Sequence, residues 1–70
     1  PLYEDLGHGI GIADQYTNMA YVHSMRRELP QALALYRKAL PLYEEVADSR
    51  RVDLTARNIQ SLQDTMDIRE

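Results

Sequence analysis

The chain has 70 residues, of which 44% are hydrophobic and 27% are charged, and its formal net charge at pH 7 is −3. This length allows one small domain or a piece of a larger one. The acidic balance argues against nucleic acid or an anionic membrane as a partner, because both are bound by basic patches. The sequence contains no Cys, which excludes disulfides, thiolate metal sites and a cysteine nucleophile.

Apolar runs in the sequence are short. None approaches the ~20 residues that a bilayer-spanning helix needs, and no signal-peptide pattern opens the chain. We therefore expect a cytoplasmic protein. The chain begins at Pro1 instead of Met, inside a pattern that recurs later, so we expect a fragment of a longer protein.

One hexapeptide occurs twice in related form. Residues 1–6, Pro-Leu-Tyr-Glu-Asp-Leu, recur at residues 41–46 as Pro-Leu-Tyr-Glu-Glu-Val, at an offset of 40. A period of about 40 residues is typical of helical solenoids. Carrying this offset forward aligns Met19 with Ile59, but a shift of 43 aligns Met19 with Leu62 equally well. The register of the second copy therefore stays open by about one helical turn.

The local pattern predicts helices throughout, because apolar residues recur at spacings of three and four. Residues 1–6 are interpreted as the end of a preceding helix, which residues 7–9, Gly-His-Gly, would stop. A first complete helix is expected over residues 10–25. A polar turn at residues 26–28 would lead into a second helix over residues 29–47, which completes a helix pair.

The second predicted helix contains Pro41, which removes a hydrogen bond and crowds the preceding turn. We expect a kink there. The alternative is a break, with Pro41 as the first residue of a new helix. A linker at residues 48–51 should follow, in which Asp48 or Ser49 caps a third helix over residues 52–66, the first helix of the next repeat.

Small residues alternate with large ones on the first two predicted helices. The first carries Tyr16-x2-Met19-Ala20-x2-His23, and the second carries Ala32-x3-Tyr36-x2-Ala39. Ala20 and Ala32 stand twelve residues apart, and their small side chains let two helix backbones approach closely. In these motifs the chain resembles a tetratricopeptide repeat, a helix pair with small residues at two crossing points.

The resemblance has two departures. His23 stands where the motif usually has Tyr, and Glu44 where it often has Pro. The period is about 40 residues instead of 34, and residues 11–13 and 39–45 look like the long-period repeats of bacterial regulatory ATPases and related signalling proteins. The resemblance implies an all-α fold, a right-handed solenoid of antiparallel helix pairs, with about one and a half repeats in this chain.

The resemblance also implies a core and a groove. The expected core residues are Tyr16, Met19, Ala20, His23, Ala32, Tyr36, Ala39, Ile59 and Leu62. First helices of successive pairs line the concave face in this family, so the expected partner-binding residues are Asp14, Thr17, Tyr21 and Ser24, joined at an offset of 40 by Arg57, Ser61 and Asp64. Tyr21 is the best candidate anchor, because an exposed aromatic side chain suits a peptide contact. The Lys and Asn set that binds C-terminal carboxylates in some family members is not matched.

No constellation in the sequence indicates catalysis. His8 and His23 fall on different elements, and the glycine-rich residues 7–11 lack the lysine of a phosphate-binding loop. The carboxylates are scattered over the chain, as expected of a solvated surface. We therefore expect no enzymatic activity, no metal and no cofactor.

The expected function is protein–protein interaction, as a scaffold or regulatory module that binds a partner peptide or helix in the groove. The alternative is self-association, because one and a half repeats leave apolar helix faces uncovered. Two chains would then stack as a homodimer, or exchange the third helix by opening at residues 48–51. Tyr36→Asp or Ile59→Asp would dissolve such a dimer and unfold the chain together.

Overall fold

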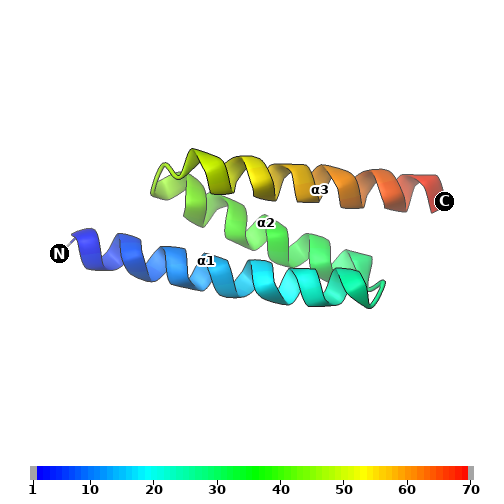
Figure 1. Cartoon of the computed structure of the whole chain (residues 1–70), viewed down its shortest axis with the longest axis horizontal. Helices are drawn as coiled ribbons and strands as arrows, with labels where there is room; N and C mark the ends of the chain where they lie inside the picture. The colour runs from blue at the N-terminus through cyan, green and yellow to red at the C-terminus, as the bar shows by residue number, and fades with distance from the viewer. Residues whose placement is uncertain (1, 70) are drawn as a thin grey trace.

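A computed structural model describes the backbone of residues 2–69 and the side chains of residues 9–68. The backbone forms three helices, α1 (Leu2–Met25), α2 (Leu29–Glu45) and α3 (Ser49–Arg69), and residues 2–69 contain no strand. The fold is therefore all-α. Figure 1 shows the chain running from left to right along α1, back along α2 and from left to right again along α3, so that α2 is antiparallel to both neighbours. The helix α2 contacts each of them.

The first helix is longer than expected. The prediction that residues 7–9 stop a helix is wrong, because α1 runs without interruption from Leu2 to Met25. A glycine ends a helix when its backbone takes a positive φ, and neither Gly9 nor Gly11 has one. Within a helix each Gly costs only about 1 kcal/mol relative to Ala. The glycines of α1 therefore weaken the helix without ending it.

The turn between α1 and α2 ends the first helix at a non-glycine residue. Arg27 has a φ of 66°, in the left-handed region. The backbone N–H of Glu28 donates to the carbonyl of His23 at 2.9 Å, and that of Arg27 donates to the carbonyl of Ser24 at 3.1 Å. These two bonds form a Schellman motif, which satisfies carbonyls at the end of the helix.

The turn between α2 and α3 repeats this geometry twenty residues later. Ala47 has a φ of 55°. The backbone N–H of Asp48 donates to the carbonyl of Tyr43 at 3.1 Å, and the backbone N–H of Ala47 donates to the carbonyl of Glu44 at 3.0 Å. Asp48 then caps α3, because its Oδ1 accepts the backbone N–H of Arg51 at 3.2 Å. The prediction of a cap at Asp48 or Ser49 is thus confirmed for Asp48, and α3 begins three residues earlier than expected.

The prolines of α2 fit a continuous helix. Pro30 is the second residue of α2, where its missing N–H leaves no bond unmade. Pro41 lies inside α2, which continues to Glu45. The alternative of a break at Pro41 is therefore wrong, and a single helix carries the residues on both sides of it.

Two clusters of buried residues join α1 to α2, each with one alanine from α1 and an alanine and a tyrosine from α2. The first cluster is Ala13, Ala39 and Tyr43, and the second is Ala20, Ala32 and Tyr36. All four alanines are fully buried. With no side chain beyond Cβ, they allow the two helix backbones to pack closely, while the tyrosines fill the space toward α3.

The remaining expected core positions divide into two groups. Tyr16, His23, Ile59 and Leu62 are half-buried. Met19 is instead 48% exposed, so its assignment to the core is corrected. Because Ala20 faces α2 and successive helical residues are about 100° apart, Met19 is turned away from that contact.

Candidate partner-binding groove

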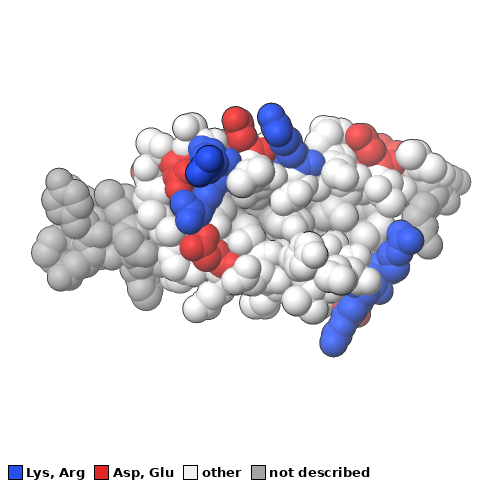
Figure 2. Space-filling model, viewed as in Figure 1, with Lys and Arg blue, Asp and Glu red and all other residues white. Residues whose placement is uncertain are grey.

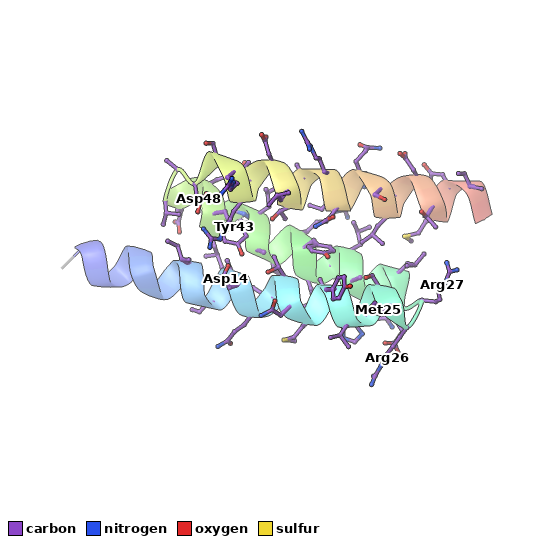
Figure 3. All side chains as sticks on the ribbon, viewed as in Figure 1. Asp14, Met25, Arg26, Arg27, Tyr43 and Asp48 are labelled. Carbon is purple, nitrogen blue, oxygen red and sulfur yellow. The ribbon has the colours of Figure 1, made fainter. Side chains whose placement is uncertain are left out.

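A pocket of about 220 Å³ opens between α1 and α3, with Tyr43 of α2 contributing to its wall. The lining residues are Asp14, Thr17, Tyr43, Arg51, Leu54, Thr55 and Asn58. On α3 they follow the spacing i, i+3, i+4, i+7, which places them on one face of a helix. Figure 3 shows Asp14 and Tyr43 near the α2–α3 turn, with Asp48 close by. The pocket is therefore built by residues from all three helices.

The link between Asp14 and Tyr43 joins α1 to α2. The Tyr43 hydroxyl donates to Asp14 Oδ1 at 2.5 Å, and Tyr43 itself is only 2% exposed. Burial, and secondarily the hydrogen bond to Asp14, raise the pKa of Tyr43. The phenol therefore keeps its proton at neutral pH and acts as the donor in this bond.

Arg51 connects the pocket to the start of α3. Its Nη1 donates to Asp48 Oδ2 at 2.6 Å, and its Nε lies 3.4 Å from Asp14 Oδ1. Hydrogen bonds from the Arg51 side chain and backbone lower the pKa of Asp48, and the same side-chain bond raises the pKa of Arg51. The guanidinium also lies 6.0 Å from the centre of the Tyr43 ring. Arg51 thus interacts with two carboxylates, and its contact with Asp48 is the shorter of the two.

The expected groove residues of α1 fall partly in this pocket. Asp14 and Thr17 line it. Tyr21 and Ser24 do not, although Tyr21 lies near enough to Tyr36 to help raise the pKa of that phenol, after the larger effect of burial. Tyr21 is 60% exposed, and the Ser24 hydroxyl donates to its carbonyl at 2.7 Å.

The expected groove residues of α3 lie outside this pocket. Arg57, Ser61 and Asp64 are exposed and do not line the pocket. The α3 residues that do line it are Arg51, Leu54, Thr55 and Asn58. The face of α3 that lines the pocket is determined by contacts with α2, and it differs from the face that the 40-residue offset selects. The 3-4-3 spacing of Val52, Thr55, Ile59 and Leu62 is the signal in the sequence that marks this inward face.

Thr55 is a pocket residue that was not among the residues expected from the sequence. It is 2% exposed, the most buried polar side chain among residues 9–68. Its position between Val52 and Ile59 on the inward face explains this burial. A β-branched threonine there fills the space that a valine would fill and adds a hydroxyl to the pocket wall.

Charged side chains lie toward both ends of the visible face. Figure 2 shows acidic and basic groups close together where α2 turns into α3, and a middle region of this face that is mostly uncharged. The pocket thus has a polar end beside the Asp48–Arg51 pair and less charged surroundings toward the middle of α3.

A second, more apolar hollow of about 250 Å³ lies on α1. Its lining residues are Asn18, Met19, Val22, His23 and Arg26. Met25, at the end of the same helix, is 69% exposed. Figure 3 shows Met25 and Arg26 at the α1–α2 turn, away from the Asp14–Tyr43 pair. This outer surface of α1 carries apolar side chains that no other described helix covers.

Of the two histidines, His23 is the one whose side chain the structure describes. His23 Nδ1 lies 2.8 Å from Glu28 Oε1, a contact that bridges the end of α1 and the residue before α2. The side chain of His8 falls outside the described residues. Across residues 9–68 there is no cluster of three or more His, Asp or Glu side chains able to hold a metal ion.

Among the helices described, none is long and apolar enough to cross a membrane. Comparison with known proteins adds no relative: no family model, no curated protein and no solved structure matches this chain.

Proposed function

We propose that the chain is a protein–protein interaction module, about one and a half repeats of a tetratricopeptide-like right-handed solenoid. The observation that carries this proposal is the pocket of about 220 Å³ between α1 and α3, which is lined by side chains of both helices and by Tyr43 of α2. The paired alanine contacts and the two matching turns support a repeated helix-pair architecture. The expected role is that of a scaffold or regulatory module without catalysis.

The lining chemistry suits a peptide. The lining combines hydroxyl, carboxylate and carboxamide groups with the apolar side chain of Leu54, which is half exposed. Asn58 offers both a donor and an acceptor, the pair that a peptide bond requires. A partner segment lying between α1 and α3 would satisfy these groups while covering Leu54.

The test is a selection of random 12-residue peptides displayed on phage against the purified chain. Recovered peptides are then measured against Asn58→Arg and, as a matched control, Gln60→Arg. Asn58 lines the pocket, whereas Gln60 is exposed on the same helix outside it. We expect Asn58→Arg to weaken binding at least about tenfold by filling the pocket, equivalent to about 1.4 kcal/mol, and Gln60→Arg to leave it unchanged. Failure to recover any binding peptide, or equal binding to both variants, contradicts the proposal.

A second candidate function is self-association through the outer surface of α1. The observation in its favour is the exposure of Met19, Val22 and Met25 around the apolar hollow. Exposed apolar patches of this kind are typical of interaction sites. Sedimentation equilibrium across a range of concentrations measures it directly: a dimer that Val22→Glu dissolves and Gln15→Glu, a substitution on the same helix, leaves intact supports this function. A monomer at all concentrations contradicts it.

A further inference from the structure

The size of the pocket between α1 and α3 limits what it holds. Its volume of about 220 Å³ is below the ~300–1,000 Å³ typical of small-molecule sites, and it suits one long side chain. Its mouth is open to solvent on the side of Leu54 and Asn58, both exposed residues of α3. A side chain of a bound partner would enter there, with its aliphatic part against Leu54 and its tip toward Asp14.

Three of the lining side chains, those of Asp14, Thr17 and Tyr43, carry oxygens with available lone pairs. Tyr43 gives its hydroxyl hydrogen to Asp14 Oδ1. Thr17 gives its own to the backbone carbonyl of Asp14 at 2.9 Å. Since each hydroxyl has one hydrogen, the Tyr43 and Thr17 oxygens that line the pocket are left as acceptors. Asp14 Oδ2, in a side chain that is 44% exposed, has no hydrogen-bond partner among residues 9–68.

Asp14 is a carboxylate of the pocket wall that is only partly compensated. Arg51 is the one cation among the lining residues, and Asp14 is the one anion. The guanidinium is held at 2.6 Å by Asp48, outside the lining, and at 3.4 Å by Asp14. Arg50 also helps to lower the pKa of Asp48. Asp48 is therefore well compensated, whereas Asp14 has the longer contact with Arg51 and is the less compensated of the two carboxylates. A cation beside Asp14 Oδ2 would complete the compensation that Arg51 gives only from the Oδ1 side.

We propose that this pocket receives the ammonium group of a lysine side chain presented by the partner protein, with Asp14, Thr17 and Tyr43 as its acceptors. An ammonium has three donors and no acceptor, which matches three oxygens that offer lone pairs and one negative charge. The four-carbon stem of lysine lies along Leu54. This inference rests on the proposed peptide-binding function and names the side chain that the groove selects.

The experiment uses three pools of 11-residue peptides with acetylated and amidated ends and a fixed central residue. The pools carry Lys, norleucine or Glu at the centre and are otherwise random. Norleucine keeps the apolar stem of lysine without the ammonium, and blocked ends remove the terminal amine as a source of the cation. Retention of each pool on the immobilised chain is measured for the unsubstituted protein, for Asp14→Asn and for Asp64→Asn. Asparagine at position 14 still accepts from Tyr43, and Asp64 is an exposed residue of α3 outside the pocket.

The Lys pool should be retained at least about tenfold more than the norleucine pool, as expected for a hydrogen-bonded charge pair. Asp14→Asn should bring this ratio close to one without lowering retention of the norleucine pool, and Asp64→Asn should leave the ratio unchanged. Equal retention of the Lys and norleucine pools, or stronger retention of the Glu pool, overturns the lysine inference while the groove still binds peptides. If no pool is retained, the proposed function itself is overturned.

Discussion

Tyr43 of α2 donates a hydrogen bond of 2.5 Å to Asp14 of α1, a residue 29 positions earlier in the chain. The same Asp14 oxygen lies 3.4 Å from Nε of Arg51 on α3. A single carboxylate oxygen thus interacts with both later helices at the point where the pocket is formed. The stability of the fold and the shape of the groove depend on the same few atoms.

Replacing Tyr43 with Phe should destabilise the chain by about 1 kcal/mol, the typical net value of one hydrogen bond. The ring stays in place, so only the bond to Asp14 is lost. Urea unfolding followed by circular dichroism measures the change. The matched control is Tyr21→Phe at a 60% exposed position, which should change the free energy of unfolding by less than about 0.5 kcal/mol. Equal losses for both variants would show that the Asp14–Tyr43 bond contributes nothing specific.

The Asp48–Arg51 pair predicts a loss of stability in acid. Hydrogen bonds from Arg51 hold the pKa of Asp48 below its ordinary value of 3.8. The folded state then binds fewer protons than the unfolded state, so this contribution is complete above pH ~4 and is lost as the pH falls toward the lowered pKa. Asp48→Asn retains a good helix cap but removes the charge. Its melting temperature should fall less steeply than that of the unsubstituted chain between neutral pH and pH ~3.

The control for this pH experiment is Asp53→Asn, which removes an exposed carboxylate from the same helix. Its melting temperature should follow the pH response of the unsubstituted chain. If Asp48→Asn shows that same response, the Asp48–Arg51 pair does not stabilise the folded state.

The close contact between α1 and α2 predicts that Ala20 tolerates no larger residue. Ala20 is fully buried against Ala32 and Tyr36, so Ala20→Leu must push the helices apart at a cost of about 1–3 kcal/mol. Ala34→Leu makes the same change at an exposed position of α2 and should be close to neutral. Thermal unfolding of the two variants compares them directly. A neutral Ala20→Leu variant would mean that the helices do not meet at this alanine.

The left-handed backbone at Ala47 predicts that an Ala→Gly substitution raises the free energy of unfolding at position 47 and lowers it at position 34. Ala47 has a φ of 55°, which costs an alanine about 1–2 kcal/mol and costs glycine little. Ala47→Gly should therefore stabilise the chain, by about 0.5–1 kcal/mol after the greater freedom of glycine in the unfolded state is subtracted. Ala34→Gly, inside α2, should destabilise it by about 1 kcal/mol. Chemical unfolding of both variants tests the signs, and destabilisation by both would contradict the turn geometry.

Several features of the fold could be predicted because they are local. Helical spacing of apolar residues identified most of the helical structure, although it divided α1 in two, and a short polar side chain before α3 identified the cap at Asp48. The resemblance also pointed to the twelve-residue spacing of Ala20 and Ala32, which lie in one buried cluster. Such features depend on neighbours within one or two helical turns, so the sequence pattern carries them directly.

Other features depend on which helices meet. The glycines of α1 favour a break by composition, yet the positive φ angles lie at Arg27 and Ala47. Met19 fits an apolar stripe, but the contact of Ala20 with α2 turns Met19 outward. On α3, a one-residue change of register separates Arg57 from Asn58, and only the latter lines the pocket.

The sequence by itself therefore determined the helical class and the small residues that allow close packing, because these follow from propensity and periodicity along one helix. Only the tertiary structure decided the register of α3 and the pairing of Asp14 with Tyr43. The physical reason is that burial against α2 selects the inward face of each helix. Since one residue turns a helix by about 100°, a small error in register exchanges a pocket side chain for an exposed one.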